Sequence, residues 1–203
     1  MIRAFLAVEV SQELLADLAT IQQELKRRID PEMKRDTRIS WVKPASLHLT
    51  IKFLGDMDEQ VIDPLRAALE QAIGGQSSAS VPLQRLGAFP RPQSPRVLWV
   101  GPSEHWERGI EPKRIGEIHG AIEQTCDRLG FLREAKPFSP HLTVARIKAG
   151  ERHVGVTLAQ SGVLDRPLSL GALAVGSVVL MKSELKPTGS VYTKLWSVRL
   201  SGT

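Results

Sequence analysis

Two short stretches of the sequence carry the same residues in the same order. Ser46–Ile51 reads SLHLTI and Ser139–Val144 reads SPHLTV, so each has Ser, His, Leu and Thr at matching positions. The chain contains five histidines. At roughly 0.06 per position for a random identity, such a match among all their pairs has odds of about 0.002. Coincidence is therefore a poor explanation, and this internal repeat is the first candidate for chemistry.

Each copy of the repeat lies in a segment typical of a β-strand, where side chains alternate between the two faces. In the first copy, His48 and Thr50 share one face, about 7 Å apart, while the leucine between them points the other way. In the second copy, His141 and Thr143 share the corresponding face. A sheet does not need histidine there for stability. Because both strands are short and flanked by turns, we expect them to face one another across a groove.

Two imidazole rings facing one another suit paired acid and base catalysis. Their unperturbed pKa of about 6.5 lets one ring be neutral, as a base, while the other is charged, as an acid. Phosphodiester cleavage needs this pair, because one group deprotonates the attacking oxygen and the other protonates the departing one. The threonine hydroxyls would donate hydrogen bonds to the non-bridging phosphoryl oxygens. The repeat therefore favours an enzyme that cleaves phosphodiesters.

Three other interpretations of these histidines stay open. A lone histidine on a strand is more often a hydrogen-bonded structural residue, although two independent structural histidines need not share their neighbours. Histidine is also a common metal ligand. However, neither copy has a nearby Cys, Asp or Glu to complete a site, so we expect neither a metal nor another cofactor. The third interpretation is a binding module for RNA or nucleotides that keeps the groove and lacks turnover.

The elements that must position the repeat follow from the hydrophobic pattern. The 3.6-residue period predicts helices over 12–29, 58–73 and 114–129, the second with a late start because of Pro64. Alternation and β-forming residues predict strands over 3–10, 39–42, 47–54, 81–89, 96–101, 137–148, 172–185 and 190–200. A linker at 74–80 could join two lobes, 102–113 is expected to be a loop, and 149–171 is ambiguous. Strands in adjacent pairs between helices indicate an α+β fold with largely antiparallel sheets.

Composition limits the class of protein. The chain has 203 residues, 42% hydrophobic and 24% charged, which suits one soluble domain and excludes a disordered tail, a fibre or a disulfide scaffold. A single cysteine, Cys126, cannot form an internal bridge, and no apolar run approaches a membrane span. We therefore expect a cytoplasmic protein without a membrane partner. The formal net charge of +5 favours polyanions without naming one.

The residues around the repeat resemble the two-histidine phosphoesterase superfamily, which is named for a tandem His-x-Thr/Ser motif. More narrowly, they resemble its bacterial and archaeal branch of RNA 2′,3′-cyclic phosphodiesterases (LigT-like). The matching stretches run in family order across nearly the whole chain: Arg3–Val8, Trp41–Pro44, Leu47–Gly55, Leu86–Pro90, Pro95–Trp99, Pro137–Arg146, Ser183–Leu185 and Tyr192–Thr193.

This resemblance implies one bilobal α+β domain over residues 1–203, with two sheets flanked by helices, pseudo-two-fold symmetry and a central cleft. It implies metal-independent hydrolysis of a terminal 2′,3′-cyclic phosphate to a 2′-phosphate, on RNA or cyclic nucleotides, and reversible 2′–5′ RNA ligation. By analogy His48 is the general acid and His141 the general base, although the residues themselves do not distinguish this from the swap. Thr50, Thr143 and Arg146 match the phosphate-binding residues. We expect a monomer.

Arg146 raises a geometric difficulty. It lies five positions after His141, so strict alternation places it on the opposite face, and a β-bulge or a guanidinium reaching around the strand end is needed to bring it in. Lys52 continues the alternation of His48 and Thr50, so it would lie either near the phosphate or in solvent. The aromatic candidates for stacking on a nucleobase are Trp41, Phe53, Phe138 and Tyr192, of which Phe53 is expected in the core with Leu49 and Ile51.

The remaining residues with chemical potential are expected to be structural. His119 falls beside the apolar stripe of a helix and should be packed, Cys126 should be buried, and His105 and His153 lie in polar segments. The sequence holds neither a P-loop nor a dinucleotide fingerprint, which disfavours a ligase that consumes ATP.

Overall fold

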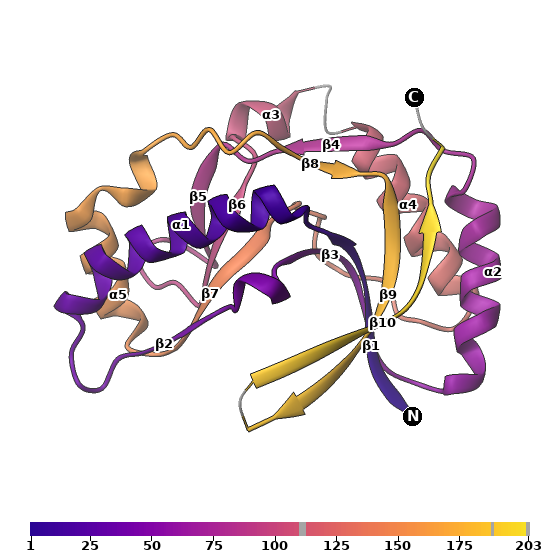
Figure 1. Ribbon diagram of the computed structural model, residues 1–203, viewed down its shortest axis with the longest axis horizontal. Helices are drawn as coiled ribbons and strands as arrows, with labels where there is room; N and C mark the ends of the chain where they lie inside the picture. Colours follow the sequence, from indigo (N-terminus) through magenta and orange to yellow (C-terminus); the bar gives the residue numbers. More distant parts are fainter. Residues whose placement is uncertain (110–112, 188, 202–203) are drawn as a thin grey trace.

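A computed structural model describes residues 1–109, 113–187 and 189–201 (Figure 1). The helices, 3-10 turns and strands within these ranges are, in chain order, β1 (Ile2–Glu9), α1 (Gln12–Ile29), η1 (Asp30–Glu32), β2 (Arg38–Trp41), η2 (Pro44–Ser46), β3 (His48–Met57), η3 (Glu59–Val61), α2 (Ile62–Ile73), β4 (Ala79–Pro82), β5 (Arg85–Phe89), β6 (Val97–Gly101), α3 (Glu104–Arg108), α4 (Lys113–Arg128), β7 (Leu142–Ala149), α5 (Glu151–Ser161), η4 (Val163–Asp165), β8 (Ala172–Val175), β9 (Ser177–Lys186) and β10 (Gly189–Arg199).

Most of the strands lie in one antiparallel sheet. Its order is β10-β9-β1-β3-β7-β6-β5, with β2 also paired to β7, while β4 and β8 form a small second sheet. The two strands that carry the repeat, β3 and β7, are neighbours in the middle of this order and meet at the pair Leu49–Leu142. The expected α+β class with antiparallel sheets is confirmed, and a single continuous sheet joins the two halves of the chain.

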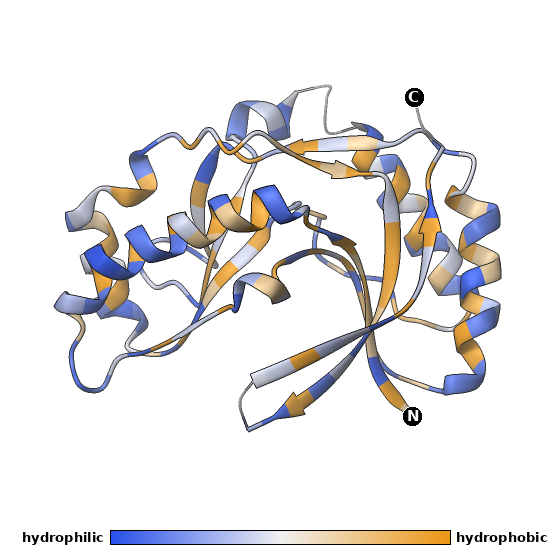
Figure 2. Cartoon of the chain, in the orientation of Figure 1, coloured by the Kyte–Doolittle hydropathy of each residue, from blue (hydrophilic) through white to orange (hydrophobic). Residues whose placement is uncertain are grey.

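The two faces of this sheet differ in what covers them. Helices α1, α2, α4 and α5 bury apolar residues in one large core together with Leu6, Leu49 and Leu142 of the strands. Blue and orange alternate along these helices in Figure 2, as amphipathic packing requires. The other face carries a small separate cluster of Phe5, Ala7 and Val179. We call this second face the open face.

The long helices form where the sequence predicts them. Ser11 caps α1, accepting a hydrogen bond from the Leu14 amide at 3.3 Å, and α2 starts only at Ile62, with Pro64 in its first turn. The ambiguous stretch 149–171 contains α5 and η4. None of the helices in the described ranges is long and apolar enough to cross a membrane.

Three local predictions are wrong. The expected loop 102–113 contains the short helix α3, which Ser103 caps through the Trp106 amide at 3.2 Å; its residues 110–112 lie outside the described part. The predicted strand over 137–148 begins only at Leu142. The predicted linker 74–80 is tied down, because the Ser78 amide donates to the Ser201 carbonyl and the Ser201 amide to that of Gln76.

Candidate active site

The two copies of the repeat lie side by side on the open face. Leu49 and Leu142 are direct neighbours across β3 and β7, and both point into the helical core. Continuing this antiparallel register sets His48 opposite Thr143 and Thr50 opposite the second histidine on the open face. The two rings are close enough for a charge on His141 to lower the pKa of His48. The structure therefore brings both motifs together.

Both histidine rings are anchored in the same way. Nδ1 of His48 donates to the Ser46 carbonyl at 2.8 Å, and Nδ1 of His141 donates to the Ser139 carbonyl at 2.8 Å. Because a carbonyl can only accept, the hydrogen of each neutral ring is on Nδ1, and Nε2 keeps its lone pair. Each ring thus offers a proton acceptor that becomes a donor once protonated.

Each ring also lies against two aromatic side chains. Phe5 and Tyr192 contact His48, with ring centroids 4.7 and 5.2 Å away. Phe89 and Trp99 take the corresponding places beside His141, at 5.0 and 6.1 Å. Of these four aromatic residues, sequence reasoning singled out only the tyrosine. The other three lie in the stretches that match the family, so the match itself could have pointed to them.

The pKa of both histidines is lowered. Burial is the main cause for each, because desolvation disfavours the charged ring, and the nearby Arg146 guanidinium acts in the same direction on both. The carbonyls that accept from Nδ1 oppose the effect. The negative charge of Glu107 also opposes it at one ring, because it raises the pKa of His141. Without a bound anion, both rings are therefore neutral at neutral pH.

A β-bulge brings Arg146 to the open face. In β7 the register against β6 shifts between Leu98 and Trp99, so two consecutive residues, Val144 and Ala145, are both buried. Alternation resumes with Arg146 exposed on the face of the motif threonine. The irregularity that the sequence required for this arginine is thus present, and the side chain lies near both histidines.

A second bulge follows the first motif and overturns two expectations. The pairing of β3 with β1 shifts between Leu6 and Ala7, so Ile51 and Lys52 are both buried. Lys52, expected on the face of His48 or in solvent, is fully buried, and Phe53, expected in the core, is 58% exposed. Phe53 lies on the open face, its ring centroid 6.1 Å from that of Phe5.

The buried Lys52 belongs to the scaffold of the site. Its Nζ donates to Glu123 Oε1 at 2.7 Å and to the Leu132 carbonyl at 2.8 Å, so it joins β3 to α4 and to the segment that leads into the second motif. His119, on the same helix as Glu123, stacks on Phe138 with centroids 4.2 Å apart. The predicted packing of His119 is confirmed, and its partner Phe138 packs against the helical core.

The other singled-out residues lie away from the histidines. Trp41 packs against the helical core beneath Lys26, whose Nζ is 5.3 Å from the ring centroid, so it does not share the open face. Cys126 is buried as expected, and burial raises the pKa of its thiol to about 12. Within residues 1–109, 113–187 and 189–201, no group of three or more His, Cys, Asp or Glu side chains could hold a metal ion.

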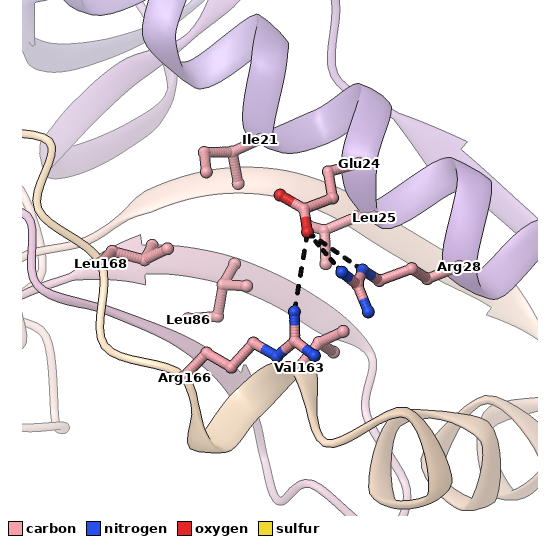
Figure 3. Close-up of a pocket in the computed structure, with 8 residues that line it drawn as sticks. All are labelled: Ile21, Glu24, Leu25, Arg28, Leu86, Val163, Arg166 and Leu168. Atoms are coloured by element: carbon pink, nitrogen blue, oxygen red, sulfur yellow. Dashed lines mark hydrogen bonds and ion pairs between the residues drawn. The ribbon is translucent and has the colours of Figure 1, made fainter.

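A small pocket lies apart from this site. Figure 3 shows it between α1, β5 and the segment after α5, with an apolar floor that includes Leu25, Leu86 and Leu168. Glu24 lies at its mouth, paired to Arg28 at 2.8 Å and Arg166 at 3.9 Å. Its volume of about 30 Å³ has room for a water molecule or two and none for a nucleotide. A larger surface groove of about 550 Å³ lies beside Phe53.

Comparison with known proteins agrees with this geometry. The family model for LigT-like phosphoesterases matches residues 8–99 and 110–192. The RNA 2′,3′-cyclic phosphodiesterase of Methanothermobacter thermautotrophicus is 30% identical over 199 residues, covering 98% of this chain and 99% of that protein. The enzyme of the same name from Thermus thermophilus is 31% identical over 203 residues, covering 98% and 91%.

Solved structures show the same fold. The crystal structure of TT0787 from Thermus thermophilus superposes with a TM-score of 0.72 at 27% identity, over 98% of each chain. That of Escherichia coli LigT complexed with 3′-AMP gives a TM-score of 0.73 at 23% identity, again over 98% of each chain.

Proposed function

Because this chain belongs to the LigT-like phosphoesterase family, we propose that it is an RNA 2′,3′-cyclic phosphodiesterase that opens the terminal cyclic phosphate to a 2′-phosphate. One observation carries the proposal: His48 and His141 lie on one face, each with Nδ1 held by a carbonyl and Nε2 left for proton transfer. The relatives that bear this name support the choice of substrate.

In the proposed reaction a water attacks phosphorus in line with the departing 3′ oxygen. Nε2 of His141 accepts a proton from the water as the new P–O bond forms. The bond to the 3′ oxygen breaks, and that oxygen takes a proton from Nε2 of His48. The product carries a 2′-phosphate and a free 3′-hydroxyl. Exchange of the two protons through solvent returns the rings to their starting states.

The remaining polar residues of the site suit the charge of the phosphate. The hydroxyls of Thr50 and Thr143 would donate to its non-bridging oxygens, and Arg146 would pair with their negative charge. Burial and this arginine lower the pKa of both rings when no anion is present. A bound phosphate opposes both influences, so that the general acid holds its proton when substrate is in place.

The open face also offers contacts beyond the cyclic phosphate. Arg146 and Lys148 are exposed on alternate positions of β7, and the exposed Arg38 lies on the adjacent strand β2. These cations suit the phosphates of an RNA chain. On the other side of the histidines, Phe53 borders a groove of about 550 Å³, which gives a nucleobase room to stack on its exposed ring.

The same arrangement would support ligation, since a ribose hydroxyl can replace water as the attacking group and form a 2′–5′ linkage. We propose that the whole chain acts as one domain and as a monomer. The continuity of the sheet across both motifs supports a single domain.

The deciding experiment measures turnover of 2′,3′-cyclic AMP and of a cyclic-phosphate-terminated oligonucleotide in EDTA, with the 2′- and 3′-phosphate products separated. We expect the 2′-phosphate from both, and loss of turnover in the His48→Ala and His141→Ala variants. Binding without turnover would show a non-catalytic module, and loss of turnover on chelation would show a metal-dependent enzyme. Either result would refute the proposal.

The path of the RNA chain can be tested in the same assay. Lys148→Ala should lower kcat/KM for the oligonucleotide several-fold and weaken its salt dependence, with the mononucleotide unaffected. Arg27→Ala is the matched control, because Arg27 is exposed on α1, the helix that covers the opposite face of the sheet. Equal effects of the two variants would exclude this path.

A further inference from the structure

One carboxylate outside the repeat is connected to the second motif. Glu107, on α3, accepts a hydrogen bond from the Ser139 hydroxyl at 3.1 Å through Oε1. The carbonyl of the same serine accepts Nδ1–H of His141 at 2.8 Å. The other carboxylate oxygen, Oε2, binds Arg85 Nη2 at 3.0 Å. A single serine thus joins the carboxylate to the catalytic ring.

The position of Glu107 is fixed by several contacts. Arg85 also donates through Nε to the Pro102 carbonyl at 2.8 Å and through Nη1 to Glu104 at 3.0 Å. The guanidinium therefore holds both ends of the short helix α3 against β5. It also lies 5.1 Å from the ring centroid of Trp99, which contacts His141. The carboxylate is half-buried and cannot turn away without breaking this set of contacts.

The first motif has no counterpart. Within the described residues, the charged groups that act on the His48 ring are Arg146 and the second histidine, both of which disfavour a proton there. The second ring has Arg146 and Glu107 acting in opposite directions. The two histidines have the same anchoring, and each contacts two aromatic rings. The carboxylate is a charged group that acts on one of them only.

The charged groups around this carboxylate are one further carboxylate and two guanidiniums. Arg85 is shared between two carboxylates, Glu104 and Glu107. Glu104 is further paired to Arg108 at 3.5 Å, and because these side chains are 64% and 82% exposed, solvent screens both of them. The remaining charges that face the ring are Arg146 and, when protonated, His48. The carboxylate oxygen beside the serine is therefore the one anionic group of this set directed at the second motif.

We propose that Glu107 is a positioning residue for His141. Through Ser139 it fixes the carbonyl that orients the ring, and its charge stabilises the imidazolium that forms when His141 takes the proton of the attacking water. The claim that Glu107 stabilises the imidazolium rests on the proposed function. The arrangement follows the logic of a catalytic triad, with a serine between the carboxylate and the imidazole.

Glu107→Gln removes the charge, and its amide oxygen can still accept from Ser139 while its NH2 group takes the place of the oxygen beside Arg85. We expect the pKa of His141, followed by NMR of labelled histidine rings, to fall, with the pKa of His48 changed much less. The acidic limb of the pH profile of kcat/KM, which the base His141 sets in the proposed reaction, should move to lower pH. The maximal rate should fall about 2–10-fold, far less than the 10²–10⁴-fold of losing an acid or base. Glu104→Gln is the matched control, since Glu104 shares Arg85 but does not touch Ser139.

If Glu107→Gln does not fold, Ser139→Ala breaks the same contact from the other side and keeps the carbonyl. It should shift the His141 titration in the same direction. An unchanged titration of His141 in the folded variant, or an equal shift in Glu104→Gln, would overturn the inference. The titration does not depend on turnover, so an inactive wild-type protein would refute the proposed function and leave the part played by Glu107 to be decided by NMR.

Discussion

Replacing Lys52 with methionine would leave a buried carboxylate without its cation. Lys52 is fully buried and the Glu123 side chain is 12% exposed, with their charged atoms 2.7 Å apart. Removing one partner of such a pair costs about 3–5 kcal/mol, because the remaining charge stays desolvated and unpaired. For a chain of this size that loss lowers Tm by about 6–20 °C. Urea unfolding followed by circular dichroism measures the free energy directly.

The double variant separates the charge from the packing. In Lys52→Met/Glu123→Leu no unpaired charge remains, and most of the lost stability should return. Lys182→Met is the surface control: Lys182 is paired to Glu184 at 3.2 Å but partly exposed, and such a pair contributes about 0–1 kcal/mol. A loss below about 1 kcal/mol for Lys52→Met, or a double variant no more stable than the single one, would refute the reasoning.

Three further outcomes are expected. His141→Ala should remove the acidic limb of the bell-shaped pH–rate profile and His48→Ala the basic limb, each slowing turnover about 10²–10⁴-fold; loss of the same limb by both would contradict the assignment. The lowered pKa of both rings means that below about pH 6.5 the unfolded chain binds more protons than the folded one, so the free energy of unfolding measured in urea titrations should decrease as the pH is lowered. The decrease should be less steep when both histidines are replaced by glutamine. Gly87→Ala would drive a Cβ into the Trp99 ring, which should cost about 1–3 kcal/mol and disturb His141. Gly75→Ala, with nothing within 4 Å of the added Cβ, should do neither, and equal Tm values for the two variants would contradict this.

The sequence sufficed for the motifs and for helices α1, α2 and α4 because both depend on local pattern. The repeat can be recognised from identity alone, and the α1 stripe follows from its period and its cap at Ser11. The faces of the strands beyond the motifs depend on pairing partners that are distant in sequence. A register shift against β1 exposes Phe53, and one against β6 exposes Arg146. Likewise, the ring contacts of Phe5 and Trp99 depend on strand order, which periodicity does not encode.

The two bulges themselves belong to the repeat. In each half the threonine is followed by two buried residues, Ile51 and Lys52 or Val144 and Ala145, and the fifth position after the histidine returns to the open face. The same backbone irregularity at the same offset indicates that the duplicated unit extends beyond His-x-Thr. The residue at that fifth position differs, an exposed aromatic ring in one half and a guanidinium in the other. On the proposed function, this difference would help to orient a nucleotide, with its phosphate toward the Arg146 guanidinium and its base toward the Phe53 ring.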